Sequence, residues 1–245
     1  IPFSDGTDMM GSCRNPAAYT NLYGFRPSPG LIPDKRGESK YPVLTTPGGI
    51  ARTPEDLSIF LDSVSGIDDE DHYSYSFEGS FRSIETHLNG NIKIGWLSNF
   101  VENYTFEKGI IELCEIALNQ FSAAEKKILI EQCNINIDHD KLWEVWCNLR
   151  SKITFDDLSS MRIQNFEELG FPVKWEYEQG EKIKEADISN AIDHYLKDRS
   201  YVDSLFDKYD FLALPSAQLF PFDKEIDFPK SIQETQMDTY HRWME

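Results

Sequence analysis

Apolar and polar residues recur along this chain with two periods, one typical of helices and one typical of strands. The clearest helical pattern covers residues 53–66. Its apolar positions recur at intervals of three and four residues: Leu57, Phe60, Leu61 and Val64. Thr53 is a natural N-cap, Pro54 fits the first helical position, and Gly66 follows the last apolar position. This pattern predicts an amphipathic helix packed on a sheet.

The same reading divides the rest of the chain into alternating elements. Helical spacing predicts further helices at residues 15–23, 106–121, 141–153, 158–169 and 188–209. The second of these is expected to place four apolar residues on one face: Ile110, Leu113, Ala117 and Phe121. Apolar runs predict strands at residues 92–97, 127–137 and 211–214, and residues 24–30, with two prolines, form a strand or a loop. This alternation favours an α/β domain.

Two stretches allow a functional and a structural interpretation. Residues 67–75 carry four acidic side chains, but they lack the alternating ligands and the central glycine of a calcium loop. A solvated turn is therefore favoured there. Four large aromatic residues lie in the helical middle of the chain: Trp143, Trp146, Phe166 and Trp175. They either line an apolar pocket or pack in the core, and core packing is favoured.

The composition narrows the classes of partner and cofactor. The formal net charge of −18 argues against nucleic acid or an anionic membrane as the main partner. The four cysteines show no CxxC spacing and no histidine cluster, so neither a metal site nor a disulfide framework is expected, and no cofactor is predicted. No apolar run reaches the length of a membrane span. We expect a cytoplasmic protein, with an upstream targeting signal left open because the sequence begins at Ile1.

The strongest candidate for chemistry is the small polar loop that carries Ser12. A helix is predicted just after it, so backbone N–H groups of the turn and of the helix start point the same way. Such donors can stabilise an oxyanion, which suits a serine nucleophile. Gly11 lets the backbone approach a substrate closely. The alternative is an ordinary turn that caps a helix, and the residues alone leave both interpretations open.

Residues 6–16 read GTDMMGSCRNP, which resembles the core of the amidase signature, G-S/T-D-x-G-G-S-I/L-R-x-P. The resemblance continues through residues 17–30 (AAYTNLYGFRPSPG) and 46–56 (TPGGIARTPED), and residues 209–216 (YDFLALPS) are similar to a later core strand of the family. It implies one partial amidase domain over residues 1–245, with the amidase-signature fold, an α/β fold with a mixed β-sheet core flanked by helices. Its expected parts are a signature core at 1–66, a variable and mostly helical region at 67–208, and a return to the core sheet at 209–245.

The resemblance also implies a role for each matching residue. Ser12 corresponds to the acylating nucleophile. The backbone N–H groups of the loop correspond to the oxyanion hole: Met9, Met10, Gly11 and Ser12. Asp8 and Arg14 match positions that brace this loop. The family completes a Ser-Ser-Lys triad with a second serine, held in a cis peptide, and a lysine base.

The sequence departs from the family pattern in two ways. Met10 stands where the family usually has glycine, so its side chain is expected to crowd or line the pocket. The cis serine and the lysine precede the nucleophile in the family, but no lysine precedes Ser12 here and Ser4 is too close to match the second serine. We therefore expect an internal fragment that lacks both ends of the domain and is inactive alone.

These observations predict an enzyme that hydrolyses carboxylic amide C–N bonds through a Ser12 acyl-enzyme. Its expected partner is a small-molecule amide, with no nucleic acid and no membrane, and a homodimer is left open. Two alternatives stay in view. One is a non-catalytic scaffold or binding subunit with an amidase fold, and the other is an amidotransferase subunit that passes ammonia to a partner. The kind of amide is not readable.

Overall fold

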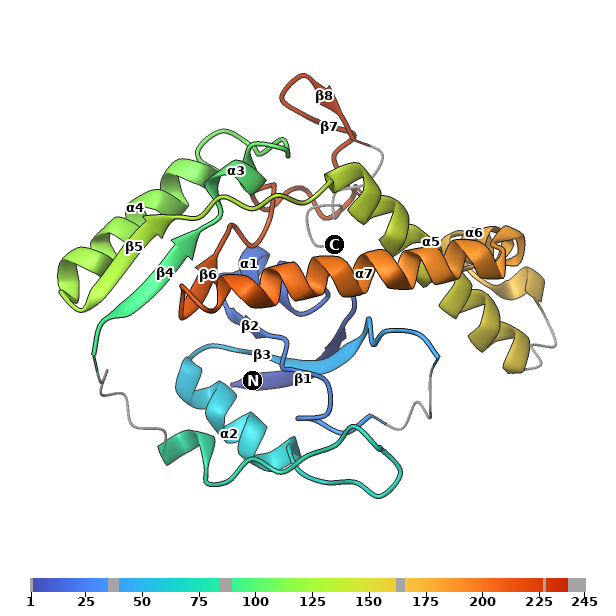
Figure 1. Cartoon of the computed structure of the whole chain (residues 1–245), viewed down its shortest axis with the longest axis horizontal. Helices are drawn as coiled ribbons and strands as arrows, with labels where there is room; N and C mark the ends of the chain where they lie inside the picture. Colours follow the sequence, from blue (N-terminus) through green and yellow to red (C-terminus); the bar gives the residue numbers. More distant parts are fainter. Residues whose placement is uncertain (1, 35–39, 84–89, 162–165, 227, 238–245) are drawn as a thin grey trace. The chain divides into compact units, whose positions relative to one another are not determined.

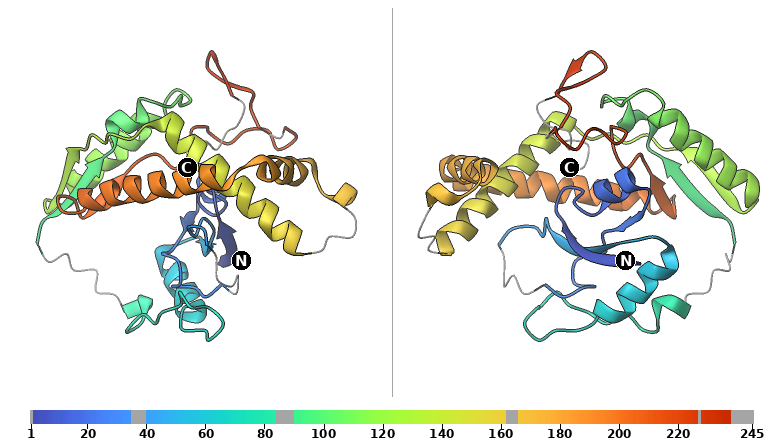
Figure 2. Two further views of the ribbon diagram at one scale, coloured as in Figure 1. Left: turned by 45° about the vertical axis from the view of Figure 1, so that its right-hand side comes forward. Right: turned by 180° about the vertical axis from the view of Figure 1, so that it is seen from behind.

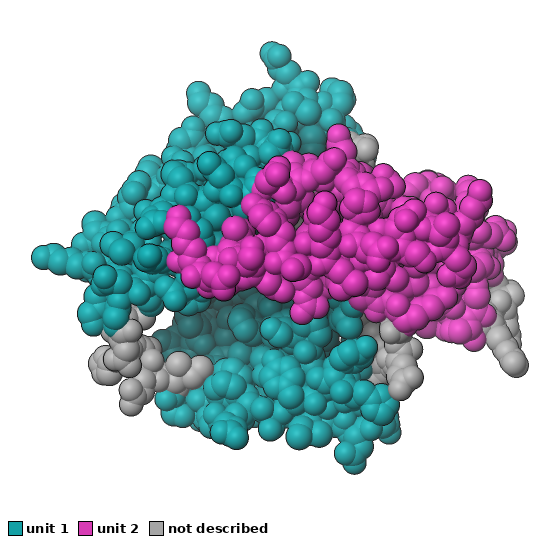
Figure 3. Space-filling model, viewed as in Figure 1, with its two compact units in different colours: residues 1–39, 43–135, 209–244 teal, residues 40–42, 136–208, 245 magenta. Residues whose placement is uncertain are grey.

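The computed structural model describes residues 2–34, 40–83, 90–161, 166–226 and 228–237. The chain divides into two compact units (Figure 3). The first contains residues 1–39, 43–135 and 209–244, and the second contains residues 40–42, 136–208 and 245. The predicted return to the core sheet at 209–245 extends past residue 237, and its last part lies outside the described residues.

An antiparallel sheet of three strands carries the candidate loop in the first unit (Figure 1). β1 (Phe3–Asp8) and β2 (Tyr23–Phe25) both pair with β3 (Thr46–Ala51), which lies between them. The sequence pattern predicted neither β1 nor β3, because glycine and polar residues replace the apolar alternation that marks a strand. β2 lies at the start of the segment that was predicted as a strand or loop.

Two helices cover opposite faces of this sheet, as Figures 1 and 2 show. Successive residues of a strand point to opposite faces. On β3, a methyl group added to Gly48 would lie 3.4 Å from Cys13 Sγ, at the start of α1 (Arg14–Thr20), whereas one added to Gly49 would meet Phe60 of α2 (Pro54–Val64). The glycines therefore bring both helices close to the strand backbone.

α2 confirms the amphipathic helix that was predicted at residues 53–66. The Thr53 side chain accepts a hydrogen bond from the Asp56 N–H at 3.1 Å, and Phe60 and Leu61 are buried. Phe60 also contacts Phe3 of β1, with ring centroids 5.7 Å apart. The helix predicted at residues 15–23 is shorter in the structure, because Asn21 adopts a left-handed conformation that ends α1.

The remaining strands of the first unit form a parallel sheet in the order β5-β4-β6. β4 (Ile92–Trp96), β5 (Ile128–Gln132) and β6 (Phe211–Ala213) confirm the three predicted strands, with shorter bounds. α3 (Ser98–Val101) and α4 (Ile110–Ala124) connect β4 to β5, and a small hairpin of β7 (Ser231–Ile232) and β8 (Thr235–Gln236) follows β6. The predicted α/β class is confirmed, but the described strands form separate antiparallel and parallel sheets where one mixed β-sheet was predicted.

α4 confirms the helix predicted at residues 106–121, with shifted bounds, but its apolar face is only partly covered. Ile110 is buried, but Leu113 is 56% exposed and Phe121 is 50% exposed. α4 packs along β5, the edge strand of its sheet, and Ile110 is the one residue of this helix that the described part of the chain buries. Periodicity identifies an apolar face, but it does not say whether another element covers that face.

The second unit is built from three long helices and a short 3₁₀ turn. These are α5 (His139–Ser160), η2 (Phe166–Glu168), α6 (Phe171–Lys182) and α7 (Glu185–Leu205). The prediction of separate helices at 141–153 and 158–169 is wrong, because α5 continues through Ser160, and α6 was missed. Trp146 is buried and stacks on Trp143, but Trp175 is 46% exposed, so core packing holds for part of the aromatic set.

The predicted variable region at residues 67–208 crosses the division into two units, because β4 pairs with both β5 and β6 and so holds residues 92–135 in the first unit. One further expectation needs correction. The acidic loop at 67–75 is only partly solvated. Asp71 is 8% exposed and accepts hydrogen bonds from the N–H groups of Asp34 and Tyr73, each at 2.9 Å.

The close contact of α1 with the antiparallel sheet predicts a strict size limit at Gly48. In Gly48→Ala, the added methyl group would overlap the Phe25 carbonyl oxygen and press on Cys13 Sγ. We expect the free energy of unfolding to fall by about 2 kcal/mol, the usual cost of overpacking. Urea unfolding measures this value. Gly170→Ala is the control, since its nearest neighbour, Pro172, would lie at an ordinary 3.9 Å; equal losses in the two variants would contradict the size limit.

Candidate active site

The candidate nucleophile lies on the loop that connects β1 to α1. Ser12 is exposed, whereas Gly11 and Cys13 on either side of it are buried. Gly11 has a φ of +89°, a backbone conformation that favours glycine, and this turn places Ser12 at the exposed position. Met10 is 8% exposed, so the side chain that replaces the family glycine is buried.

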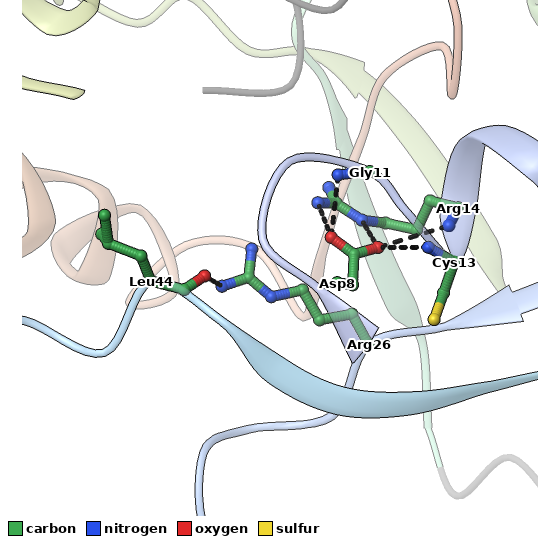
Figure 4. A network of polar contacts seen from close by, with 6 residues as sticks. All are labelled: Asp8, Gly11, Cys13, Arg14, Arg26 and Leu44. Carbon is green, nitrogen blue, oxygen red and sulfur yellow. Dashed lines mark hydrogen bonds and ion pairs between the residues drawn. The ribbon is translucent and has the colours of Figure 1, made fainter. Parts of the chain in front are cut away.

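Asp8 organises this loop by accepting hydrogen bonds on both carboxylate oxygens (Figure 4). Its Oδ1 accepts from the Gly11 N–H and from Arg14 Nη2, both at 2.8 Å. Its Oδ2 accepts from the Cys13 N–H at 3.1 Å, from the Arg14 N–H at 3.3 Å and from Arg14 Nε at 3.0 Å. The bidentate guanidinium and the three backbone donors join the end of β1 to the start of α1.

The pKa of Asp8 reflects two opposing causes. The Asp8 side chain is fully buried, and burial alone would raise the pKa of its carboxyl group. The hydrogen bonds and charge of Arg14, together with the N–H groups of Gly11 and Cys13, outweigh burial and lower this pKa to about 2. Asp8 is therefore ionised at neutral pH, and its charge is balanced by Arg14.

We refer to Asp8 and Arg14, with the hydrogen bonds that they form in the loop, as the Asp8 clamp. This clamp divides the backbone N–H groups of the loop into those that donate to Asp8 and those that do not. The Gly11 N–H donates to Asp8, so this group is occupied in the structure and is removed from the predicted oxyanion donors. Within the part of the chain that the structure describes, the N–H groups of Met9, Met10 and Ser12 have no hydrogen-bond partner. Pairing within the described residues therefore does not occupy these three donors.

Cys13 does not compete with Ser12 as a nucleophile. Its side chain is fully buried, and a methyl group added to Gly6 would lie 3.1 Å from its sulfur. Burial, followed by the negative charge of Asp8, raises the pKa of the Cys13 thiol to about 11. A thiol that is both enclosed and protonated at neutral pH is not a reactive nucleophile.

Sequence reasoning missed two contributions to this site. Gly6, Gly24 and Gly48, one from each strand of the antiparallel sheet, face the start of α1, and an added methyl group at any of them would lie within 3.4 Å of Cys13. Arg26 follows β2, and its Nη2 donates to the Leu44 carbonyl oxygen at 2.8 Å, which fixes the segment before β3 (Figure 4). The glycine repeat was visible in the sequence, but its shared face required the strand register.

Other catalytic machinery is sparse among the described residues. The Ser12 hydroxyl has no hydrogen-bond partner there, and no group of three or more metal-ligating side chains is placed to hold an ion. All four cysteines are free thiols. No described helix is long and apolar enough to cross a membrane.

The sequence model of the amidase family matches residues 1–245. The chain belongs to the amidase family. This assignment agrees with the geometry of the β1–α1 loop, which carries the residues that match the amidase signature. The assignment of a role to each loop residue remains a prediction.

The chain is similar to known amidases and to amidotransferase components over part of their length. It is 31% identical to a component of the glutamyl-tRNA(Gln) amidotransferase of Mycoplasma pneumoniae over 139 residues, which are 55% of this chain and 27% of that protein. A bacterial aryl acylamidase matches the structure with a TM-score of 0.85 and 24% identity, over 100% of this chain and 52% of that chain. The 6-aminohexanoate cyclic dimer hydrolase matches with a TM-score of 0.75 and 15% identity, over 99% and 54%. This chain thus spans about half of these amidase structures.

The Asp8 clamp makes a prediction about stability and pH. A carboxyl group whose pKa falls on folding stabilises the protein above its unfolded pKa, and this stabilisation is lost as the pH falls through the folded pKa. For Asp8 the window runs from the ordinary pKa of 3.8 down to about 2. We expect Asp8→Asn to lower the free energy of unfolding by about 2 to 3 kcal/mol at pH 7, because Arg14 loses its charged partner.

Urea unfolding of both proteins between pH 2 and 7 measures this difference. The gap between wild type and Asp8→Asn should be largest near pH 7 and shrink below about pH 4. Asp5→Asn is the matched control, because Asp5 lies exposed on the same strand. A gap that stays constant across this range would show that the charge of Asp8 does not stabilise the fold.

Proposed function

We propose that this protein hydrolyses carboxylic amides and that Ser12 is the acylating nucleophile. The observation that carries the proposal is the exposed Ser12 hydroxyl, at the tip of a loop clamped by Asp8 and Arg14, in a chain of the amidase family. In this reaction the Ser12 oxygen attacks the amide carbon, and the amine leaves with a proton. Water then cleaves the resulting ester and regenerates Ser12.

The free donors of the loop fit the charge that develops in this step. As the tetrahedral intermediate forms, the carbonyl oxygen becomes negative and requires N–H groups aimed at it. We assign this role to the backbone N–H groups of Met9, Met10 and Ser12. Removal of one such donor typically costs on the order of 3 kcal/mol of barrier.

The clamp supports this role without opposing the developing charge. A buried carboxylate close to an oxyanion would repel it, but Asp8 is neutralised by a bidentate ion pair with Arg14. We therefore assign Asp8 and Arg14 as positioning residues. They fix the orientation of the backbone at Ser12, and they do not act on the substrate themselves.

The family resemblance supplies the rest of the proposed mechanism. It places a cis serine and a lysine ahead of the nucleophile, and these groups would move the proton of Ser12 as a Ser-Ser-Lys triad. No organic cofactor and no metal has a role in it. We also propose a cytoplasmic location and a small-molecule amide as the substrate, and the aryl acylamidase and the cyclic dimer hydrolase show how widely amide substrates differ on this fold.

A second candidate function is supported by the sequence relatives. Matches of 31% to 37% identity are to components of glutamyl-tRNA(Gln) amidotransferases, including that of Pseudomonas fluorescens. An amidotransferase component would release ammonia from an amide at the same Ser12 and pass it to a partner chain. Stable co-purification with such a chain would favour this function over a free-standing amidase. A non-catalytic scaffold and a homodimer remain alternatives to test alongside it.

The assignment of Ser12 predicts a selective loss of covalent labelling. In the protein that includes the expected upstream serine and lysine, a fluorophosphonate probe should label wild type and fail to label Ser12→Ala. Turnover of an aryl amide should fall at least about a thousandfold, as for other serine nucleophiles. Labelling is read by intact-mass spectrometry.

Ser4→Ala serves as the control for this experiment. Ser4 is also an exposed serine of the same unit, on β1, so its removal should leave labelling and turnover unchanged. Undiminished turnover in Ser12→Ala would overturn the proposal. No labelling of the folded wild type would favour the scaffold.

A further inference from the structure

A cavity of the first unit, away from the Ser12 loop, combines aromatic and acidic side chains. It has a volume of about 500 Å³ and is lined by residues of β4, α3, α4, the segment between α3 and α4, and the β7–β8 hairpin. Three aromatic residues line it: Trp96, Tyr104 and Phe106. Two carboxylates, Glu102 and Glu115, line it as well. None of these residues belongs to the Ser12 loop.

Hydrogen bonds fix the wall that closes this cavity. Gln233 of the hairpin donates from Nε2 to the Phe106 carbonyl oxygen at 3.0 Å, and the hydroxyl groups of Thr105 and Thr235 lie 3.3 Å apart. Gln218, which is 2% exposed, donates from Nε2 to the Thr105 carbonyl oxygen at 2.8 Å. The aromatic floor is also fixed, because Trp96 is 3% exposed and Phe106 is 7% exposed.

Glu102 and Glu115 are exposed residues at the lining of the cavity, and neither has a counterion among the described residues. Among the described residues, the side chains of Glu102 and Glu115 form no hydrogen bond and no ion pair. Unpaired carboxylates next to an apolar floor repel an anion and give no advantage to a neutral apolar molecule. They do stabilise a cation, as do the negative faces of aromatic rings.

We propose that this cavity binds a small organic cation, a primary ammonium group carried on an aromatic or alkyl body. The ammonium would lie against Glu102 and Glu115, and its apolar body would lie against the aromatic wall that Trp96, Tyr104 and Phe106 form. The volume suits one small molecule of this kind. The site is independent of the proposed Ser12 chemistry, because binding here requires no turnover.

Titration with benzylammonium, followed by NMR of the ¹⁵N-labelled protein, tests this site. We expect saturable binding in the millimolar range or tighter, with shifts at the amides of Tyr104, Gln233 and Thr235. Benzyl alcohol, which has the same ring and no charge, should bind at least about tenfold more weakly. Ser12→Ala should bind benzylammonium like wild type, which separates this result from the fate of the proposed amidase activity.

Charge variants distinguish binding in this cavity from general attraction of a cation to an acidic protein surface. The double variant Glu102→Gln and Glu115→Gln should weaken benzylammonium binding at least about tenfold. Glu112→Gln is the control, since Glu112 is exposed on α4 and does not line the cavity, and its binding should stay within about twofold of wild type. Circular dichroism confirms that the variants are folded. Absence of saturable binding, equal binding of benzyl alcohol, or equal weakening in Glu112→Gln would each overturn the proposal.

Discussion

A single buried carboxylate determines the local structure on which the candidate active site depends. Asp8 ends β1, and its two oxygens accept hydrogen bonds from three backbone N–H groups and from the Arg14 guanidinium. A buried carboxylate is costly unless it is hydrogen-bonded, and the observed path of the loop supplies those bonds. That path exposes Ser12 and leaves three neighbouring N–H groups without a partner in the described residues. Stability and proposed chemistry therefore depend on the same interaction.

The antiparallel sheet provides the second constraint, which is space. The N-terminal end of α1 lies directly on the strand backbone because Gly6, Gly24 and Gly48 offer no side chain at that face. Cys13 fills the remaining gap, and its buried, protonated thiol is a packing group. The opposite face of the sheet receives the larger Phe60 of α2. Small residues on one face and an aromatic residue on the other thus fix the position of the loop between the two helices.

Local signals in the sequence predicted the elements that depend on local physics. The N-cap and first-turn proline of α2 act within one turn, so Thr53 and Pro54 sufficed to place it. The strands β1 and β3 lack apolar alternation. They are stabilised by pairing with each other in one register, and a short stretch of sequence does not reveal that pairing. The exposed Leu113 and Phe121 of α4 and the division into two units depend on distant segments. At the candidate site, motif matching predicted roles for Ser12, Asp8 and Arg14, but only the geometry showed that the Gly11 N–H is occupied.

Amide hydrogen exchange at Gly11 and Cys13 tests the central claim most directly, because these two N–H groups donate to Asp8 and to no helix or strand partner. In wild type both amides should be protected. In Asp8→Ala both should exchange at least about tenfold faster, relative to the amides of β4 in the same sample. The β4 reference removes the effect of a global loss of stability. If Gly11 and Cys13 kept their protection in Asp8→Ala, the Asp8 carboxylate would not be what holds the Ser12 loop.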